Sequence, residues 1–108
     1  MPTYIIKREI TITRQEGDVA DIVITVPAIL SMTGRTARLQ VRDSNHRVII
    51  DKQPNDMSIT GQVISIPLLP INTQGKEGQH RWELEVTDDA GPITIGKGAF
   101  VIVKTYIR

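Results

Sequence analysis

The chain has 108 residues, with 13 basic and 12 acidic side chains and a formal net charge of +1. This length predicts one domain, and the balanced charge predicts no attraction to nucleic acid. The absence of cysteine excludes a disulfide framework, a thiolate nucleophile and a cysteine zinc site. No apolar run approaches the ~18 residues of a membrane-spanning helix, so we expect no membrane partner.

Isoleucine, valine and threonine make up about a third of the chain, and β-branched side chains favour strands over helices. Apolar residues recur with a period near two, which is typical of strands that are buried on one face. In chain order we expect strands at 4–13, 19–26, 37–42, 48–50, 57–60, 62–68, 80–86 and 93–103, the last kinked at Gly96 and Gly98.

Turn-forming residues separate these runs. Gly17 and Asp18 end the first, residues 28–34 connect the second to the third, and residues 72–78 form a loop or a single helical turn. Residues 88–91, Asp-Asp-Ala-Gly, predict a hairpin. Some of the eight runs are short or irregular, so the pattern predicts about seven strands. It therefore predicts an all-β fold, an immunoglobulin-like antiparallel β-sandwich in one domain, 1–108.

The strands at 37–42 and 80–86 alternate most cleanly, and in an immunoglobulin-like sandwich the third and sixth strands are antiparallel neighbours. Their outward residues, Arg38, Gln40 and Arg42 on one strand and Glu85, Glu83 and Arg81 on the other, are therefore expected to face one another in a register that the sequence leaves open. Their inward residues are expected to share one core, formed by Leu39, Val41, Trp82 and Leu84.

The chemistry-bearing side chains favour structural roles. His46 lies in a polar turn, and His80 is expected to be a hydrogen-bonded residue at the core edge rather than a ligand or a base. Glu83 and Glu85 are two apart on a polar strand face, so they lie side by side in solvent rather than across a cleft. We therefore expect no enzyme, and no catalytic residue, metal, cofactor or small-molecule substrate.

Three runs are apolar on both faces: residues 4–6, 48–50 and 100–103. Either these are central strands covered by the chain itself, or something packs against them from outside. The second interpretation predicts a homo-oligomer or partner contact with the candidate interface residues Tyr4, Ile5, Val48, Ile50, Phe100, Ile102 and Tyr106.

Five stretches carry a resemblance to a known family. They are residues 10–18, residues 32–34 with 37–43, residues 59–66, residues 78–88, and residues 98–102. In order and spacing they resemble the immunoglobulin-like domain at the N-terminus of phage baseplate upper proteins and related tail and head-fibre proteins. The chain departs from that family at residues 68–78 and in having Trp82 and His80 where tyrosines are common.

The resemblance implies a structural component of a phage virion, located in the tail, baseplate, neck or capsid. It would be made in the bacterial cytoplasm without a signal peptide and would assemble with other virion proteins through its strand edges. The alternative is a host-surface adhesion or carbohydrate-binding module on the same sandwich, because fold does not fix function.

Overall fold

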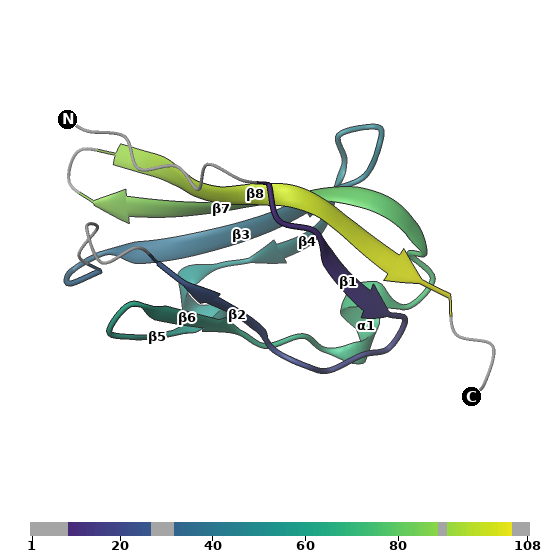
Figure 1. Ribbon diagram of the computed structural model, residues 1–108, viewed down its shortest axis with the longest axis horizontal. Coiled ribbons are helices and arrows are strands. Elements are labelled where there is room, and N and C mark those ends of the chain that lie inside the picture. Colours follow the sequence, from purple (N-terminus) through teal and green to yellow (C-terminus); the bar gives the residue numbers. More distant parts are fainter. Residues whose placement is uncertain (1–8, 27–31, 89–90, 105–108) are drawn as a thin grey trace.

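The computed structural model describes residues 9–26, 32–88 and 91–104, which form two β-sheets packed face to face (Figure 1). One sheet has five strands in the order β1-β8-β7-β3-β4, and the other has three in the order β2-β6-β5. This is the strand order of an immunoglobulin-like sandwich, so the predicted all-β sandwich is confirmed. The strands are β1 (Ile12–Gln15), β2 (Ile22–Thr25), β3 (Thr36–Arg42), β4 (Val48–Lys52), β5 (Ser58–Thr60), β6 (Val63–Ile66), β7 (Gly78–Asp88) and β8 (Gly91–Val103), with two short helices, η1 (Pro54–Asp56) and α1 (Pro70–Thr73).

The first and last strands differ from the expectation. The run predicted at 4–13 starts outside the described residues, and β1 forms only from Ile12. It pairs with β8 in parallel, so the sandwich is not antiparallel throughout. The stretch 93–103 is part of one continuous strand, β8, whose register with β7 shifts between Leu84 and Glu85. The alternating pattern did not predict that β1 and β8 pair in parallel, because it shows which face of each strand is buried and not which distant strand lies beside it.

β3 and β7 are antiparallel neighbours, as predicted, and the structure sets the register that the sequence left open. Arg38 lies opposite Glu85, Gln40 opposite Glu83, and Arg42 opposite Arg81. The hydrogen bonds do not follow these pairs, since the Arg38 guanidinium turns to Asp51 on β4, with N–O distances of 3.2 and 3.1 Å. The alternating pattern determines which side chains share a face, but the neighbouring strand β4 also places a carboxylate within reach of Arg38.

The core lies between the two sheets and includes the four predicted residues, each no more than 2% exposed: Leu39, Val41, Trp82 and Leu84. Three further residues from the both-face apolar runs, Ile50, Phe100 and Ile102, belong to the same cluster. Because β8 lies between β1 and β7 in the sheet, its apolar run is that of an internal strand. The single helical turn α1 begins at Pro70, two residues ahead of the segment 72–78 in which a loop or helical turn was predicted, and ends inside it at Thr73.

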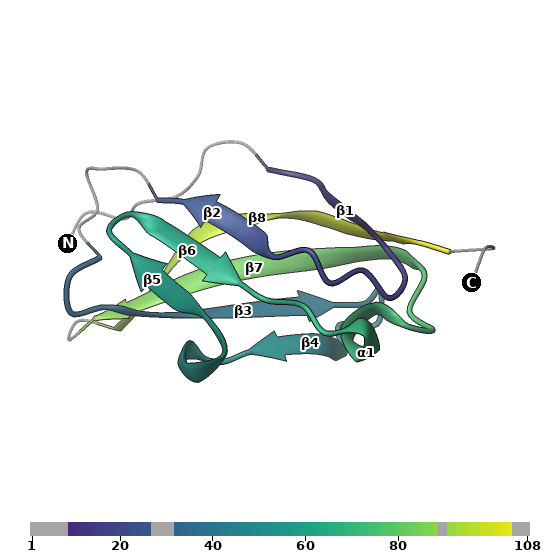
Figure 2. The ribbon, with the colours of Figure 1, turned by 90° about the horizontal axis from the view of Figure 1, so that it is seen from below.

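Figure 2 shows the smaller sheet lying across only part of the larger one, with β1 ending at the end of the molecule near α1. Five strands facing three cannot cover one another fully. The inner faces of the outermost strands of the larger sheet therefore depend on side chains and loops for cover, and this mismatch produces the groove described below.

Candidate functional site

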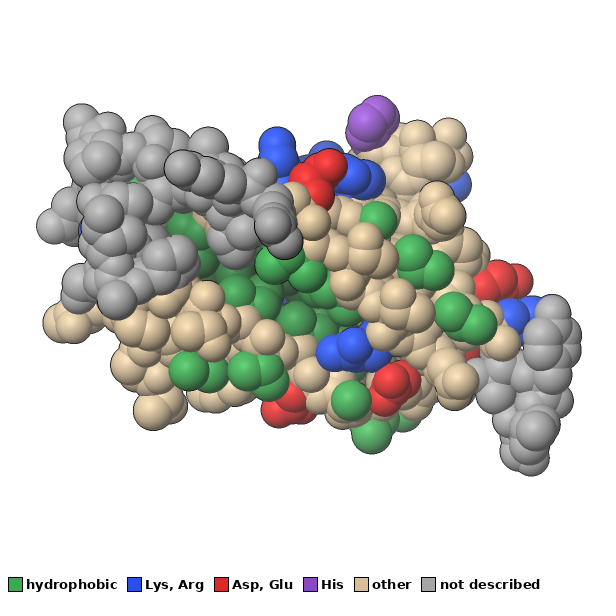
Figure 3. Space-filling view, viewed as in Figure 1, with side chains coloured by type: hydrophobic (Ala, Val, Ile, Leu, Met, Phe, Trp, Pro, Cys, Tyr) green, Lys and Arg blue, Asp and Glu red, His purple; other side chains and the backbone are tan. Residues whose placement is uncertain are grey.

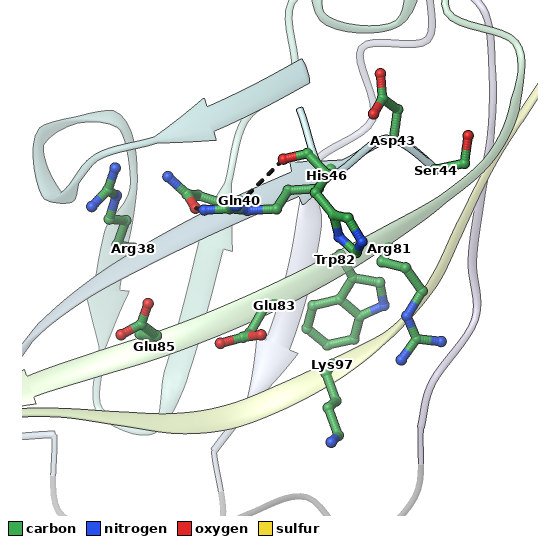
Figure 4. Close-up of a pocket in the computed structure, with 11 residues that line it drawn as sticks. Arg38, Gln40, Asp43, Ser44, His46, Arg81, Trp82, Glu83, Glu85 and Lys97 are labelled. Carbon is green, nitrogen blue, oxygen red and sulfur yellow. Dashed lines mark hydrogen bonds between the residues drawn. The ribbon is translucent and has the colours of Figure 1, made fainter. Parts of the chain in front are cut away.

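A polar hollow of about 530 Å³ lies on the outer face of the five-stranded sheet (Figure 4). Its lining comes from β3, β7, β8 and the turn after β3: Arg38, Gln40, Arg42, Asp43, Ser44, His46, Arg81, Trp82, Glu83, Glu85 and Lys97. Cations and carboxylates are interleaved across the strands, so the hollow has no single sign of charge.

Most of these charges are held by their neighbours. The Arg38 hydrogen bond holds the pKa of Asp51 below its usual range, and Asp51 in turn raises the pKa of Arg38. Arg81 donates to Glu9 and lowers the pKa of that carboxyl. Arg42 donates to the Gln40 amide oxygen at 3.0 Å. These contacts give each of the three arginines a partner on or beside the hollow.

The two histidines take the expected places. His46 is exposed in the turn after β3 with a φ of 64°, a left-handed conformation that few residues other than glycine adopt. Half-buried His80 places Nε2 2.7 Å from the Lys76 carbonyl oxygen, at the edge of the core. Within the described ranges, no three His, Cys, Asp or Glu side chains gather closely enough to hold a metal ion.

A second hollow, of about 270 Å³, is a groove of mixed polar and apolar lining between β1 and β2, which we call the seam. It is lined by Ile10, Thr11, Ile12, Thr13, Arg14, Ile22, Val23, Ile24, Thr25 and Trp82. Figure 3 shows hydrophobic side chains gathered across the middle of this face, over the gap between the two sheets. Ile10 is 46% exposed and Val23 is 60% exposed, which makes them the most accessible large apolar side chains of the seam.

The wall of the seam ahead of β1 is positioned by a close approach of two main chains. The Ile10 N–H donates to the Lys97 carbonyl at 3.1 Å, and the Ile10 carbonyl accepts the indole N–H of Trp82 at 2.7 Å. A Cβ at position 98 would lie 2.0 Å from the Ile10 oxygen, so only glycine fits at Gly98. A kink was predicted at Gly96 and Gly98; the register shift lies beside Gly96, and Gly98 is required by the close approach of two backbones.

The connection from β1 to β2 is also tied down. The Gly17 N–H donates to the Thr73 hydroxyl at 2.8 Å, and the Gly75 N–H donates to the Glu16 carboxylate at 2.7 Å. Arg14 reaches across from β1 to the Asp21 carbonyl just before β2, at 3.2 Å. These bonds hold the two strands at a fixed separation, so the seam is preformed.

The edge of β2 that faces the seam presents main-chain groups. Among the described strands, β2 pairs with β6 alone, in the register Ile22 to Ile66 through Thr25 to Val63. The next N–H, that of Val26, donates to the Gln62 carbonyl at 2.7 Å. Antiparallel ladders bond at every second residue, so Ile22 and Ile24 bond to β6 while the N–H and C=O of Val23 and Thr25 point to the free edge.

The structure does not bring the candidate interface residues predicted from the sequence together on one surface. Tyr4, Ile5 and Tyr106 lie outside the described residues. Ile50, Phe100 and Ile102 are at most 2% exposed, so a partner cannot touch their side chains without opening the core.

Val48, 43% exposed on β4, is the one candidate on the described surface. The seam was not anticipated, although one signal for it was present. Val23 occupies an outward position in a strand without charge, Ile-Val-Ile-Thr, where a polar side chain is usual.

None of the helices in the described part of the chain has the length and apolar character needed to cross a membrane. No protein-family model matches the chain, and no curated protein matches it. Solved structures do match: CopC from Methylosinus trichosporium OB3b aligns with a TM-score of 0.53 at 9% identity, covering 91% of this chain and 88% of that one. At this identity the likeness defines the fold: both chains are all-β sandwiches.

These comparisons correct the resemblance to phage baseplate upper proteins, which is wrong. No family model supports it, and the shared fold is found in CopC. The resemblance rested on strands and turns that a sandwich of this order requires, such as the core residue Trp82 and the turn at Gly61, where φ is 59°. The predicted function in a phage virion is wrong with it, and the comparison does not support an adhesion or carbohydrate-binding module either.

Proposed function

We propose that this chain is a protein-interaction module that binds an extended polypeptide segment as an added strand at the free edge of β2. The observation that carries the proposal is the seam. It combines main-chain donors and acceptors of Val23 and Thr25, which point away from the one strand paired with β2 in the described part of the chain, with a groove alongside them that is partly apolar. Strand addition uses these two elements: main-chain hydrogen bonds for affinity and a groove for alternate side chains.

The chemistry of the seam defines the segment that fits it. Four isoleucines and Trp82 form the apolar part of the groove wall, beside threonines and Arg14, so every second side chain of the added strand should be apolar. The side chains between them face outward beside Val23 and Thr25, where uncharged β-branched residues pair well. The expected ligand is therefore an uncharged segment that alternates apolar and small polar residues.

The size of the groove favours side chains over a free small molecule. About 270 Å³ is below the ~300–1,000 Å³ of most small-molecule pockets. The polar hollow on the opposite sheet is larger, but its arginines and carboxylates are largely engaged with one another. Because the seam is held open by Arg14 and the Gly17–Thr73 bond, binding requires little ordering of the chain.

The test uses a short peptide of alternating threonine and isoleucine with lysine at both ends, added to the full chain at about 1 µM. Trp82 is the only tryptophan and lines the seam, so its fluorescence reports occupancy. We expect a saturable change in Trp82 emission. Val23→Pro removes an N–H that points to the free edge and leaves the β6 ladder intact, so this variant should lose the response.

Val23→Thr is the matched control, because it keeps the N–H and the β-branched shape, and it should bind like the original chain. Circular dichroism checks that both variants are folded. Equal binding by Val23→Pro, or the absence of a saturable signal from the original chain, contradicts strand addition at β2.

A further inference from the structure

We infer that the strand received at β2 is the β2 strand of a second copy of this chain, so that two smaller sheets join edge to edge across a two-fold axis. The inference rests on the proposed function and names its partner. Three observations support it: the composition of the β2 edge, the uncharged outer face of the smaller sheet, and the self-matching register of the strand.

Four strands form the outer edges of the two described sheets, and β2 differs from the other three. β1 carries Arg14, and β4 carries Asp51 and Lys52, charges that discourage pairing between edges. β5 has three residues and follows directly on η1, which leaves little edge to pair. β2 has no charged residue within its bounds, and Val23 is 60% exposed on it.

The outer face of the smaller sheet is uncharged. Its outward residues form two rows across β2, β6 and β5, because Ser65 lies between Val23 and Ser58, and Val63 lies between Thr25 and Thr60. The outer face of the larger sheet, in contrast, carries Arg38, Arg42, Arg81, Glu83, Glu85 and Lys97.

A two-fold contact brings a surface against a copy of itself. Joining the smaller sheets at β2 extends the uncharged rows into the second copy, with no like charges in opposition along the strand. The absence of charge is therefore the electrostatic complementarity that an identical partner needs.

Two copies of β2 can pair in an antiparallel register that is symmetric about a two-fold axis. Paired residues must lie on the same face, so the numbers of any two opposed residues must sum to an even value. A two-fold axis at Ile24 satisfies this condition and sets Val23 opposite the partner's Thr25, and Thr25 opposite the partner's Val23. These are the residues whose N–H and C=O groups point to the free edge, so they can exchange hydrogen bonds as a bonded pair.

The strand is four residues long, so the contact is far smaller than the ~1,600 Å² of a standard stable interface. We therefore expect a weak dimer that forms as the concentration rises. Sedimentation of the full chain from about 10 µM to about 1 mM should show its average mass rising from 12.0 kDa toward twice that value.

Two variants locate the contact. Thr25→Lys places a charge on the joined edge beside the partner's Val23 and should keep the mass at the monomer value across the whole range. Thr36→Lys is the matched control, since Thr36 is an exposed residue at the start of β3 in the other sheet, and it should dimerise like the original chain.

The outcomes separate this inference from the proposed function. A chain that stays monomeric throughout, yet binds the threonine–isoleucine peptide through Val23, overturns the second-copy partner and leaves strand addition standing. A dimer that survives both Thr25→Lys and Val23→Pro places the contact elsewhere and also overturns the inference. A monomer that fails to bind the peptide overturns both.

Discussion

Gly98→Ala is the substitution that tests how the seam is built. The added Cβ would lie 2.0 Å from the Ile10 oxygen, 2.7 Å from its carbonyl carbon and 2.8 Å from its nitrogen. These are main-chain atoms, so no side chain can rotate to make room, and the segment ahead of β1 has to move off β8.

Two hydrogen bonds depend on that approach: Ile10 N–H to Lys97 C=O at 3.1 Å, and Trp82 Nε1–H to Ile10 C=O at 2.7 Å. Leaving the indole N–H unsatisfied costs about 1–3 kcal/mol, and losing the main-chain bond costs about 1 kcal/mol more. We expect the free energy of unfolding to fall by about 2–4 kcal/mol, a large share of the ~5–15 kcal/mol that holds a domain together.

Urea unfolding followed by circular dichroism measures this loss, and Trp82 emission reports the change around the indole. A double-mutant cycle with Trp82→Phe isolates the bond. If the Ile10 carbonyl has already moved away, the two substitutions together should cost less than their separate costs added. A Gly98→Ala protein within about 0.5 kcal/mol of the original, or strictly additive costs, would refute the close approach as the structure places it.

Three further substitutions test the core and the charged contacts. Trp82→Ala removes the largest fully buried side chain and should cost about 3–5 kcal/mol, seen as loss of the cooperative urea transition. Arg38 holds the pKa of Asp51 below its unfolded value, so the stability that the pair contributes is present at neutral pH and is lost as the pH falls below about 4. In Asp51→Asn the free energy of unfolding should therefore fall less steeply with pH in that range, and an unchanged dependence on pH argues against the pair. Lys76→Met leaves three main-chain carbonyls without their ammonium donor and should cost about 1–3 kcal/mol, whereas a change under 0.5 kcal/mol would mean that water replaces it.

The sequence was most informative where alternation was cleanest. The inward and outward faces of β3 and β7 follow from the period of two, because a slip of one residue would turn Leu39 and Trp82 out of the core, but the pattern left open which residues lie opposite one another. The hydrogen-bond partner of Arg38 could not be predicted in this way. It is Asp51 on β4, and a side chain as long as arginine can reach partners on either neighbouring strand.

The seam could not be predicted from the pattern. It exists because a sheet of five strands faces a sheet of three, and the number of strands in each sheet is a property of the topology. The both-face apolar run at Phe100 and Ile102 left two interpretations open, a central strand or an interface, and it belongs to a strand with neighbours on both sides. The exposed apolar position that matters, Val23, sits in a run that alternates like any buried strand.

The most direct measurement is amide hydrogen exchange along β2, with and without the threonine–isoleucine peptide, at a concentration where the chain is monomeric. The Ile22 and Ile24 amides bond to β6 and should be protected in both states, while those of Val23 and Thr25 should exchange rapidly in the free chain. Strand addition predicts that the peptide slows exchange at Val23 and Thr25. If those two amides are unaffected, or if the slowing falls on β4 or β5 instead, the account of the β2 edge as the binding site is contradicted.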